Sequence, residues 1–466
     1  MTAPSHATRR SPLPRPRTIG VVVAALAIVG ATYGFHALRP AAPVAPVVQV
    51  PAVTDPNAEP PAIALPGDPP GEPAIGSIEQ IDHSIKAWTT NLTTNPKDFI
   101  SATNLALLYH GRGRLSGDLA DQTRALEAAR TASALAPTET AARSLEASIL
   151  YTLHDFSGSL AIADALYRAH PADIGSLATR ADDELELGQT SAARTDYAAV
   201  AAAAPGPAVD VRLARLAYLT GDPAKALTLA LHALKVQSED PEADLGFYQY
   251  AVGEYARLGG DATLARTSYK AALTIRPTDF GALVGLAKVD AAEGPIDAAI
   301  TGLEAAAAIV PQPETLTLLG DLQALRGDAT AAGEQYATVR AIRQLSQLEG
   351  TVYDRQLALF ELDHGGATDG ILAAAQAGLA TRTDAAGHDL VAWAAYRLGQ
   401  LDLAEQQIQL ARADGIVDAR ILEHAGAIAV ARGDAATGDT LLRQALALGP
   451  ALDPLATAEA QRLLGD

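Results

Sequence analysis

The sequence predicts an all-α protein: an α-solenoid of about ten stacked helix-turn-helix repeats, preceded by one transmembrane helix and a proline-rich linker. Hydrophobic residues make up 48% of the 466 residues but aromatic residues only 5%, so the apolar content is mostly Ala and Leu, which favour helices. Intervals of 33, 39, 34, 33, 38, 34 and 34 residues separate Gly188, Gly221, Gly260, Gly294, Gly327, Gly365, Gly399 and Gly433. Such regular punctuation predicts repeated helix pairs and argues against one long coiled coil.

The chain begins with a basic cluster and an apolar run. Its first 40 residues hold no acidic residue and five arginines, Arg9, Arg10, Arg15, Arg17 and Arg39. The 17 residues from Ile19 to Phe35 are uncharged, which is just enough for a membrane-spanning helix. Because positive charge stays on the cytoplasmic side, we expect a cytoplasmic N-terminus over residues 1–18 and a transmembrane signal-anchor over residues 19–38. Cleavage of a signal peptide followed by secretion is the alternative.

Residues 39–77 are rich in Pro and Ala, as in "PAAPVAPVVQVPAV". Proline at this density blocks helix formation and favours the extended polyproline conformation. We therefore expect a semi-stiff linker that holds residues 78–466, the repeat domain, away from the membrane on its extracytoplasmic side. The chain would be a single-pass protein of the cell membrane.

Charge and cysteine content exclude several functions. The net charge of −19 combines the basic N-terminus with a strongly acidic remainder, which repels phosphate backbones, so we expect no nucleic-acid partner. There is no Cys, which excludes disulfides, thiol catalysis and cysteine-bound zinc. The Ala- and Arg-rich, Lys-poor composition indicates a bacterial source.

The repeats can be compared within single units. Residues 280–311, "FGALVGLAKVDAAEGPIDAAITGLEAAAAIVP", place Leu283, Leu286 and Ala287 on one face of a first helix, and Ala299, Leu303 and Ala306 on one face of a second. Small residues on these faces allow two helices to approach closely. A period of 34 residues built from two helices resembles the tetratricopeptide repeat. The resemblance covers about residues 100–450 in roughly ten units, with a capping helix expected after Pro454.

The tripeptide Arg-Gly-Asp occurs twice, at residues 326–328 and 432–434. An adhesion signal is one interpretation. The other is a turn between helices, because sister turns carry Gly221-Asp222 and Gly260-Asp261 at the same place in the repeat. Glycine suits a left-handed residue that ends a helix, and aspartate suits the cap of the next helix. We therefore interpret both tripeptides as turns.

No motif for catalysis or cofactor binding emerges. The sequence lacks HExxH, a phosphate-binding loop and a G-x-S-x-G elbow. We interpret residues 111–117, "GRGRLSG", as an inserted loop, and the run Asp182, Asp183, Glu184 and Glu186 as a solvated helix face. His154, His364 and His388 are expected to be solvated turn residues. We expect no catalytic, metal or cofactor site and no small-molecule substrate, and an enzyme is the least expected class.

In tetratricopeptide proteins the first helices line a concave groove that binds peptides, and the resemblance implies such a groove here. Alignment on the turn glycines places ten residues on it: Arg215, Tyr218, Phe247, Tyr250, Glu254, Arg257, Lys288, Arg355, Trp393 and Tyr396. Aromatic and Arg side chains are good anchors for a partner. The resemblance thus implies a membrane-tethered scaffold that binds a protein or peptide. The alternative is a self-assembling subunit of an envelope complex.

Overall fold

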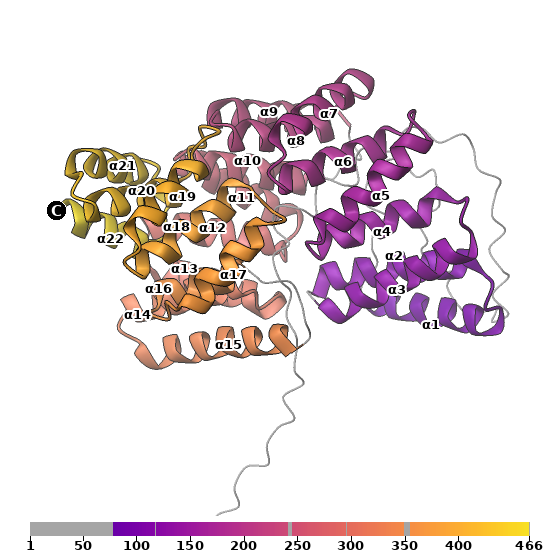
Figure 1. The fold of residues 1–466 in the computed structure, drawn as a ribbon. Helices are drawn as coiled ribbons and strands as arrows, with labels where there is room; N and C mark the ends of the chain where they lie inside the picture. The colour runs from indigo at the N-terminus through magenta and orange to yellow at the C-terminus, as the bar shows by residue number, and fades with distance from the viewer. Residues whose placement is uncertain (1–77, 117, 241–244, 295, 349–354, 466) are drawn as a thin grey trace, which may run out of the picture.

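The computed structural model describes residues 78–116, 118–240, 245–294, 296–348 and 355–465. The predicted N-terminal segment, membrane anchor and linker (1–18, 19–38 and 39–77) lie outside these residues. None of the described helices combines the length and apolarity that crossing a membrane requires. The described chain is an α-helical solenoid, as predicted, in which short helices stack side by side (Figure 1).

Ten helix pairs make up the solenoid in this part of the chain. The first helices are α2 (Phe99–Ser116), α4 (Thr140–Thr152), α6 (Ile174–Glu186), α8 (Pro207–Leu219), α10 (Gly246–Leu258), α12 (Phe280–Glu293), α14 (Pro313–Leu325), α16 (Arg355–Asp363), α18 (Ala385–Arg397) and α20 (Ala419–Ala431). The second helices are α3 (Leu119–Leu135), α5 (Phe156–Ala169), α7 (Thr190–Ala203), α9 (Pro223–Gln237), α11 (Ala262–Ile275), α13 (Ile296–Ile309), α15 (Ala329–Leu348), α17 (Asp369–Leu379), α19 (Leu401–Ala411) and α21 (Ala435–Ala447). Helix α1 (Ile78–Thr94) precedes the pairs, and η1 (Gly449–Ala451) and α22 (Pro454–Leu464) follow them. The predicted number of units and the capping helix after Pro454 are confirmed.

The turns within the pairs have the predicted pattern of a left-handed glycine, followed in several turns by a capping aspartate. Left-handed backbone occurs at seven of the eight repeating glycines: Gly188, Gly221, Gly260, Gly327, Gly365, Gly399 and Gly433. Asp434 caps α21 by accepting a hydrogen bond from the Thr437 amide at 3.1 Å, and Asp328 accepts one from the Ala331 amide at 3.0 Å. Both Arg-Gly-Asp tripeptides are therefore turns. The exception is Gly294, which is extended, as expected for a residue that precedes a proline.

Packing between the two helices of a pair depends on small residues, as the sequence predicted. Ala287, Ala299, Leu303 and Ala306 are buried and belong to one apolar cluster. Elsewhere a glycine of the first helix faces a ring of the second. A side chain on Gly253, for example, would meet the ring of Tyr269 at 2.7 Å. Close backbone approach thus leaves room for one large residue per crossing.

The loop predicted at residues 111–117 is wrong. Helix α2 continues through Ser116, so these residues are helical up to the connection to α3. Arg112 stabilises the extra turn by pairing with Asp121 of α3 at 2.6 Å, and His110 Nδ1 lies 2.7 Å from Gln122 Oε1. A Gly-rich composition suggested a loop, but side-chain contacts with α3 outweigh the low helix propensity of glycine.

The solenoid turns back on itself, so that residues 382–465, here named the closing arm, lie against turns of much earlier repeats (Figure 1). Ala214, Ala217 and Tyr218 of α8 share one apolar core with arm residues such as Ile416 and Ile421. We name the C-terminal ends of α6, α8 and α10, together with the turns that follow them, the receiving edge. Polar contacts join the two parts through Arg382–Glu186 (2.6 Å), Thr383–Leu187 (3.2 Å), Thr190–Asp414 (2.9 Å), Tyr218–Asp418 (2.7 Å) and Arg257–Pro450 (3.3 Å).

Candidate functional site

The closure forms a partly open cavity of about 970 Å³. Eight first helices border it, from α6 to α20 in steps of two, together with α7, α19, η1 and α22. First helices face the inside because the second helices of the pairs cover their outer side. The volume is at the upper end of the range for ligand sites.

Six of the ten predicted groove residues border this cavity: Arg215, Tyr218, Arg257, Lys288, Arg355 and Trp393. Each makes a contact within the protein. Arg215 pairs with Glu186, Lys288 with Glu314 at 2.6 Å, and Arg355 with Asp384 at 2.7 Å. The Trp393 indole donates a hydrogen bond to Asp363 at 2.7 Å. Any ligand would thus meet an ordered lining.

The other four predicted residues lie away from the cavity. Tyr250 is buried over Gly281 of the next first helix, and Glu254 is bound by Arg257 at 2.9 Å. Phe247 packs edge-on against Tyr248, with 5.2 Å between ring centroids. Tyr396 stacks on Trp393 at 4.9 Å. Successive helix positions are about 100° apart, so a small register error moves a side chain from the groove into a helix–helix contact.

The acidic run of α6 is buried, so the expectation of a solvated face is wrong. Helix α6 is covered on several sides, and its carboxylates meet different neighbours. Asp182 binds Arg212 of α8 at 3.0 Å, and Asp183 accepts a hydrogen bond from Ser159 of α5 at 2.7 Å. Glu186 accepts from Arg382 of the closing arm. Burial raises the pKa of Asp183 well above its usual range, which favours the neutral acid.

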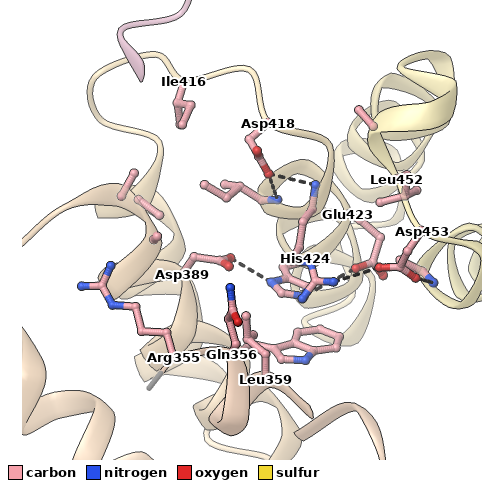
Figure 2. A pocket seen from close by; sticks show the side chains of 18 of the residues that line it. Arg355, Gln356, Leu359, Asp389, Ile416, Asp418, Glu423, His424, Leu452 and Asp453 are labelled. Carbon is pink, nitrogen blue, oxygen red and sulfur yellow. Dashed lines mark hydrogen bonds and ion pairs between the residues drawn. The ribbon is translucent and has the colours of Figure 1, made fainter. Parts of the chain in front are cut away.

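Two histidines also have polar partners: His364, for which the expectation was wrong, and His424, which was not identified from the sequence. His364 was expected at a solvated turn, but its Nε2 lies 2.8 Å from Asp321. His424 of α20 is buried, and its Nδ1 lies 2.8 Å from Asp389 of α18. Burial disfavours the imidazolium, but the charge of Asp389, its hydrogen bond and the charge of Glu423 together outweigh burial and raise the pKa of His424. Figure 2 shows this pair at the cavity wall.

An aromatic stack continues from His424. The His424 ring lies on Trp393 with centroids 3.9 Å apart and an interplanar angle of 9°, and Tyr396 covers Trp393 on the same helix. The Arg397 guanidinium lies 5.6 Å from the Trp393 ring centroid. The stack makes a flat, rigid wall beside the cavity.

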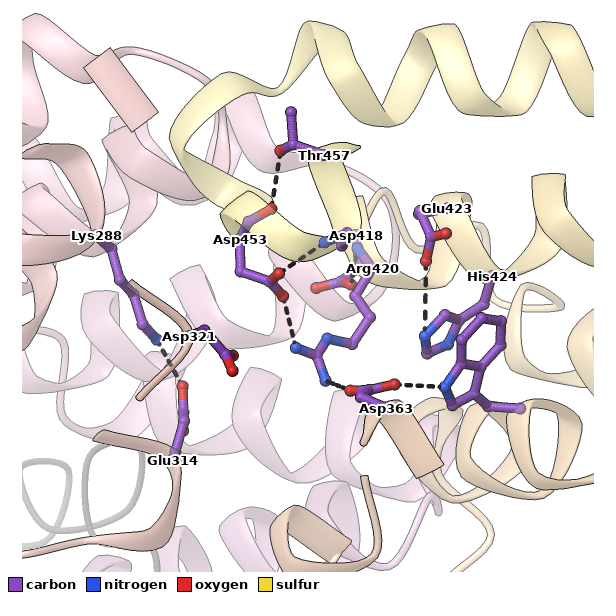
Figure 3. Close-up of polar contacts among 12 residues, drawn as sticks. Lys288, Glu314, Asp321, Asp363, Asp418, Arg420, Glu423, His424, Asp453 and Thr457 are labelled. Atoms are coloured by element: carbon purple, nitrogen blue, oxygen red, sulfur yellow. Dashed lines mark hydrogen bonds and ion pairs between the residues drawn. The ribbon is translucent and has the colours of Figure 1, made fainter. Parts of the chain in front are cut away.

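A chain of charges surrounds the stack. Arg420 pairs with Asp453 at 2.9 Å and lies 3.9 Å from Asp363, which also holds the Trp393 indole. Asp453 in turn caps α22 through the Ala456 amide at 2.8 Å. Figure 3 shows the Arg420 side chain between Asp453 and Asp363. Four helices thus contribute to one polar cluster, and nothing in the linear sequence groups them.

Glu423 of α20 borders the cavity and is 2% exposed. Its Oε2 lies 3.7 Å from His424 Nε2, whereas its Oε1 has no hydrogen-bond partner among the described residues. Burial raises the pKa of Glu423 to about 7, although the His424 charge opposes the shift. The side chain therefore titrates near neutrality.

Across the whole lining, seven Arg or Lys residues face eleven Asp or Glu residues. The cavity is therefore acidic, which favours basic ligands. Among the described residues, no group of three or more His, Asp or Glu side chains has the geometry of a metal site.

No protein-family profile matches the sequence, and no curated protein matches it. Several solved structures are similar in fold. The human IFIT1 dimer is 13% identical over 79% of this chain and 86% of its own, with a TM-score of 0.45. A tetratricopeptide repeat protein from Parabacteroides merdae is 16% identical over 52% and 98%, with a TM-score of 0.37. PilW, a type IV pilus biogenesis factor, is 20% identical over 43% and 91%, with a TM-score of 0.36. At these identities the likeness concerns the helical-repeat fold alone.

Proposed function

We propose that this chain, a helical-repeat protein of the tetratricopeptide type, is a membrane-tethered scaffold whose cavity binds a segment of a partner protein. The observation that carries the proposal is the cavity lining. Eight first helices converge on one space in which carboxylates outnumber basic side chains. A partner segment rich in basic residues complements this charge.

The membrane tether is supported by the sequence of residues 1–38. An uncharged apolar run follows a cluster of arginines, the order typical of an anchor with a cytoplasmic N-terminus. The repeat domain would then face the extracytoplasmic side. Alkaline phosphatase fused after Asp466 should be active in cells, and activity of β-galactosidase at the same position would contradict the topology.

Site-specific photocrosslinking in cells tests the scaffold function. Leu410 borders the cavity and is 45% exposed, whereas Leu231 lies on the second helix α9, away from the cavity, and is 40% exposed. A benzophenone amino acid should form a discrete partner adduct at position 410 and none at position 231. Mass spectrometry of the adduct identifies the partner segment. The same adducts at both positions, or none at position 410, would contradict binding in the cavity.

A further inference from the structure

The strongest unexplained feature of the cavity is the carboxylate of Glu423. It is almost fully buried yet borders the cavity, and its Oε1 atom has no partner among the described residues. A buried carboxylate that lacks hydrogen bonds costs free energy. A donor from a ligand would remove this cost.

Two basic side chains nearby, His424 and Arg420, are already engaged by carboxylates. His424 shares its Nδ1 with Asp389 at 2.8 Å, and Arg420 is held by Asp453 at 2.9 Å. Figure 3 shows Arg420 directed to Asp453 and Asp363, and Glu423 directed to His424. Neither side chain donates to Oε1 of Glu423, so a donor from a ligand would complete it.

Aromatic rings accompany this carboxylate. Trp393 borders the cavity next to His424 and carries Tyr396 behind it, and aromatic rings attract cations. Burial raises the pKa of the Tyr396 phenol, and the charges of Glu459 and Glu423 raise it further, which places both carboxylates in the field of this ring. Glu459 borders the cavity as well. Carboxylate and aromatic groups thus combine at one end of the cavity.

From this arrangement we infer that the cavity contains a site for a primary ammonium group, a lysine side chain of the bound segment, with Glu423 as its ion-pair partner and Trp393 beside it. Lysine fits better than arginine. A guanidinium binds best to two carboxylate oxygens at once, but Oε2 of Glu423 already faces His424, which leaves Oε1 for a point charge. The inference rests on the proposed function, since it names the type of residue in the partner segment that the cavity binds.

The test uses the full chain and three end-blocked peptides: tetralysine, the same peptide acetylated on all four side chains, and tetra-arginine. The chain has two tryptophans, Trp88 and Trp393, so a Trp88→Phe background reports binding through Trp393 fluorescence. Calorimetry on the chain without that substitution checks each affinity. Glu423→Gln is the test variant, and Glu304→Gln on α13, exposed and outside the cavity lining, is the matched control.

Tetralysine should bind with saturation and more tightly than tetra-arginine. Glu423→Gln should weaken its binding about tenfold or more, while Glu304→Gln leaves it unchanged. Acetylation of the four lysine side chains should abolish the tighter binding of tetralysine.

Equal affinity of tetralysine and its acetylated form would overturn the ammonium site but leave peptide binding in the cavity standing. Equal affinity for tetra-arginine, or no effect of a folded Glu423→Gln variant, would also overturn it. Since the peptide comparison needs no cavity substitution, misfolding of the variant does not block the test. Binding of no peptide would overturn the site, and the crosslink at position 410 then decides the proposed function separately.

Discussion

A turn of the receiving edge, at Gly221, and a turn that no described residue covers, at Gly433, have the same backbone conformation and the same cap. They differ in what packs against them. Gly221 on the receiving edge and Gly433 on the closing arm are both left-handed, and each precedes an aspartate that caps the next helix. A side chain on Gly221 would overlap the backbone of Gly415, whereas one on Gly433 would meet nothing within 4 Å. Both turns therefore end a helix, but only the turn at Gly221 also forms a long-range interface.

Substituting alanine at the two glycines measures this difference directly. Gly433→Ala should cost about 1–2 kcal/mol, the strain of a left-handed non-glycine residue. Gly221→Ala has the same strain and in addition forces the closing arm away, so it should cost about 3–4 kcal/mol when overpacking is included. Denaturant unfolding of both variants checks the comparison. Equal losses would mean that the arm does not rest on this turn in solution.

Removing Arg382 tests the polar side of the closure. Its guanidinium donates to the carboxylate of Glu186 at 2.6 Å and to the carbonyl oxygen of the same residue at 2.8 Å. Arg382→Ala should destabilise the chain by about 2 kcal/mol, typical for hydrogen bonds to charged groups, and small-angle scattering should show a larger radius of gyration. The control is Arg168→Ala, whose 77% exposed side chain pairs with Asp164 and should contribute less than about 1 kcal/mol. An unchanged radius in Arg382→Ala would contradict a closure held by this contact.

The comparison also explains what the sequence predicted and what it missed. Turn glycines and capping aspartates depend on residues a few positions apart, so the turn at Gly433-Asp434 could be predicted from the sequence. The closing contacts join residues between 193 and 224 positions apart, and they depend on the accumulated rotation of six repeats, which no local pattern encodes.

The candidate site shows the same division. Register from the turns placed Arg215 and Trp393 on the cavity but misplaced Tyr250, which fills space over Gly281. His424 was missed because Asp389 and Trp393, which contact it, come from another repeat. Glu423 was missed because a lone Glu-His pair is a weak signal. The acidic run of α6 was visible yet misjudged, because its burial follows from helices that pack around it.

The two regions also differ in the surroundings of a buried carboxylate, which bears on how stability depends on pH. Glu186 on the receiving edge contacts Arg215 and Arg382. Glu423 in the closing arm, which His424, Asp453, Arg420 and Asp363 face, has a pKa raised to about 7, so the folded state keeps its proton at pH values where the unfolded chain has lost it.

Stability must therefore fall as pH rises from the ordinary carboxyl range through 7. The raised pKa of His424 acts in the same direction, because its stabilisation is lost as pH rises through the folded value. Between pH 6 and pH 8, Glu423 should account for a loss of about 1.4 kcal/mol, and Glu423→Gln should flatten the slope by that amount. Denaturant unfolding at both pH values measures it, with Glu304→Gln as control. An unchanged slope in Glu423→Gln would mean that this carboxylate stays ionised.

The smallest effect is expected from the hydroxyl of Tyr218, which donates to Asp418 at 2.7 Å. Asp418 also caps α20 through the amides of Arg420 and Ile421, so it keeps two partners when the hydroxyl is removed. Tyr218→Phe should therefore cost only about 0.5–1 kcal/mol, while the ring keeps its place in the shared apolar core and the radius of gyration stays unchanged. A double-mutant cycle with Asp418→Asn isolates the pair. A loss as large as that of Arg382→Ala would show that the closure depends on this one bond, whereas a small loss assigns it to the apolar contact and to Arg382.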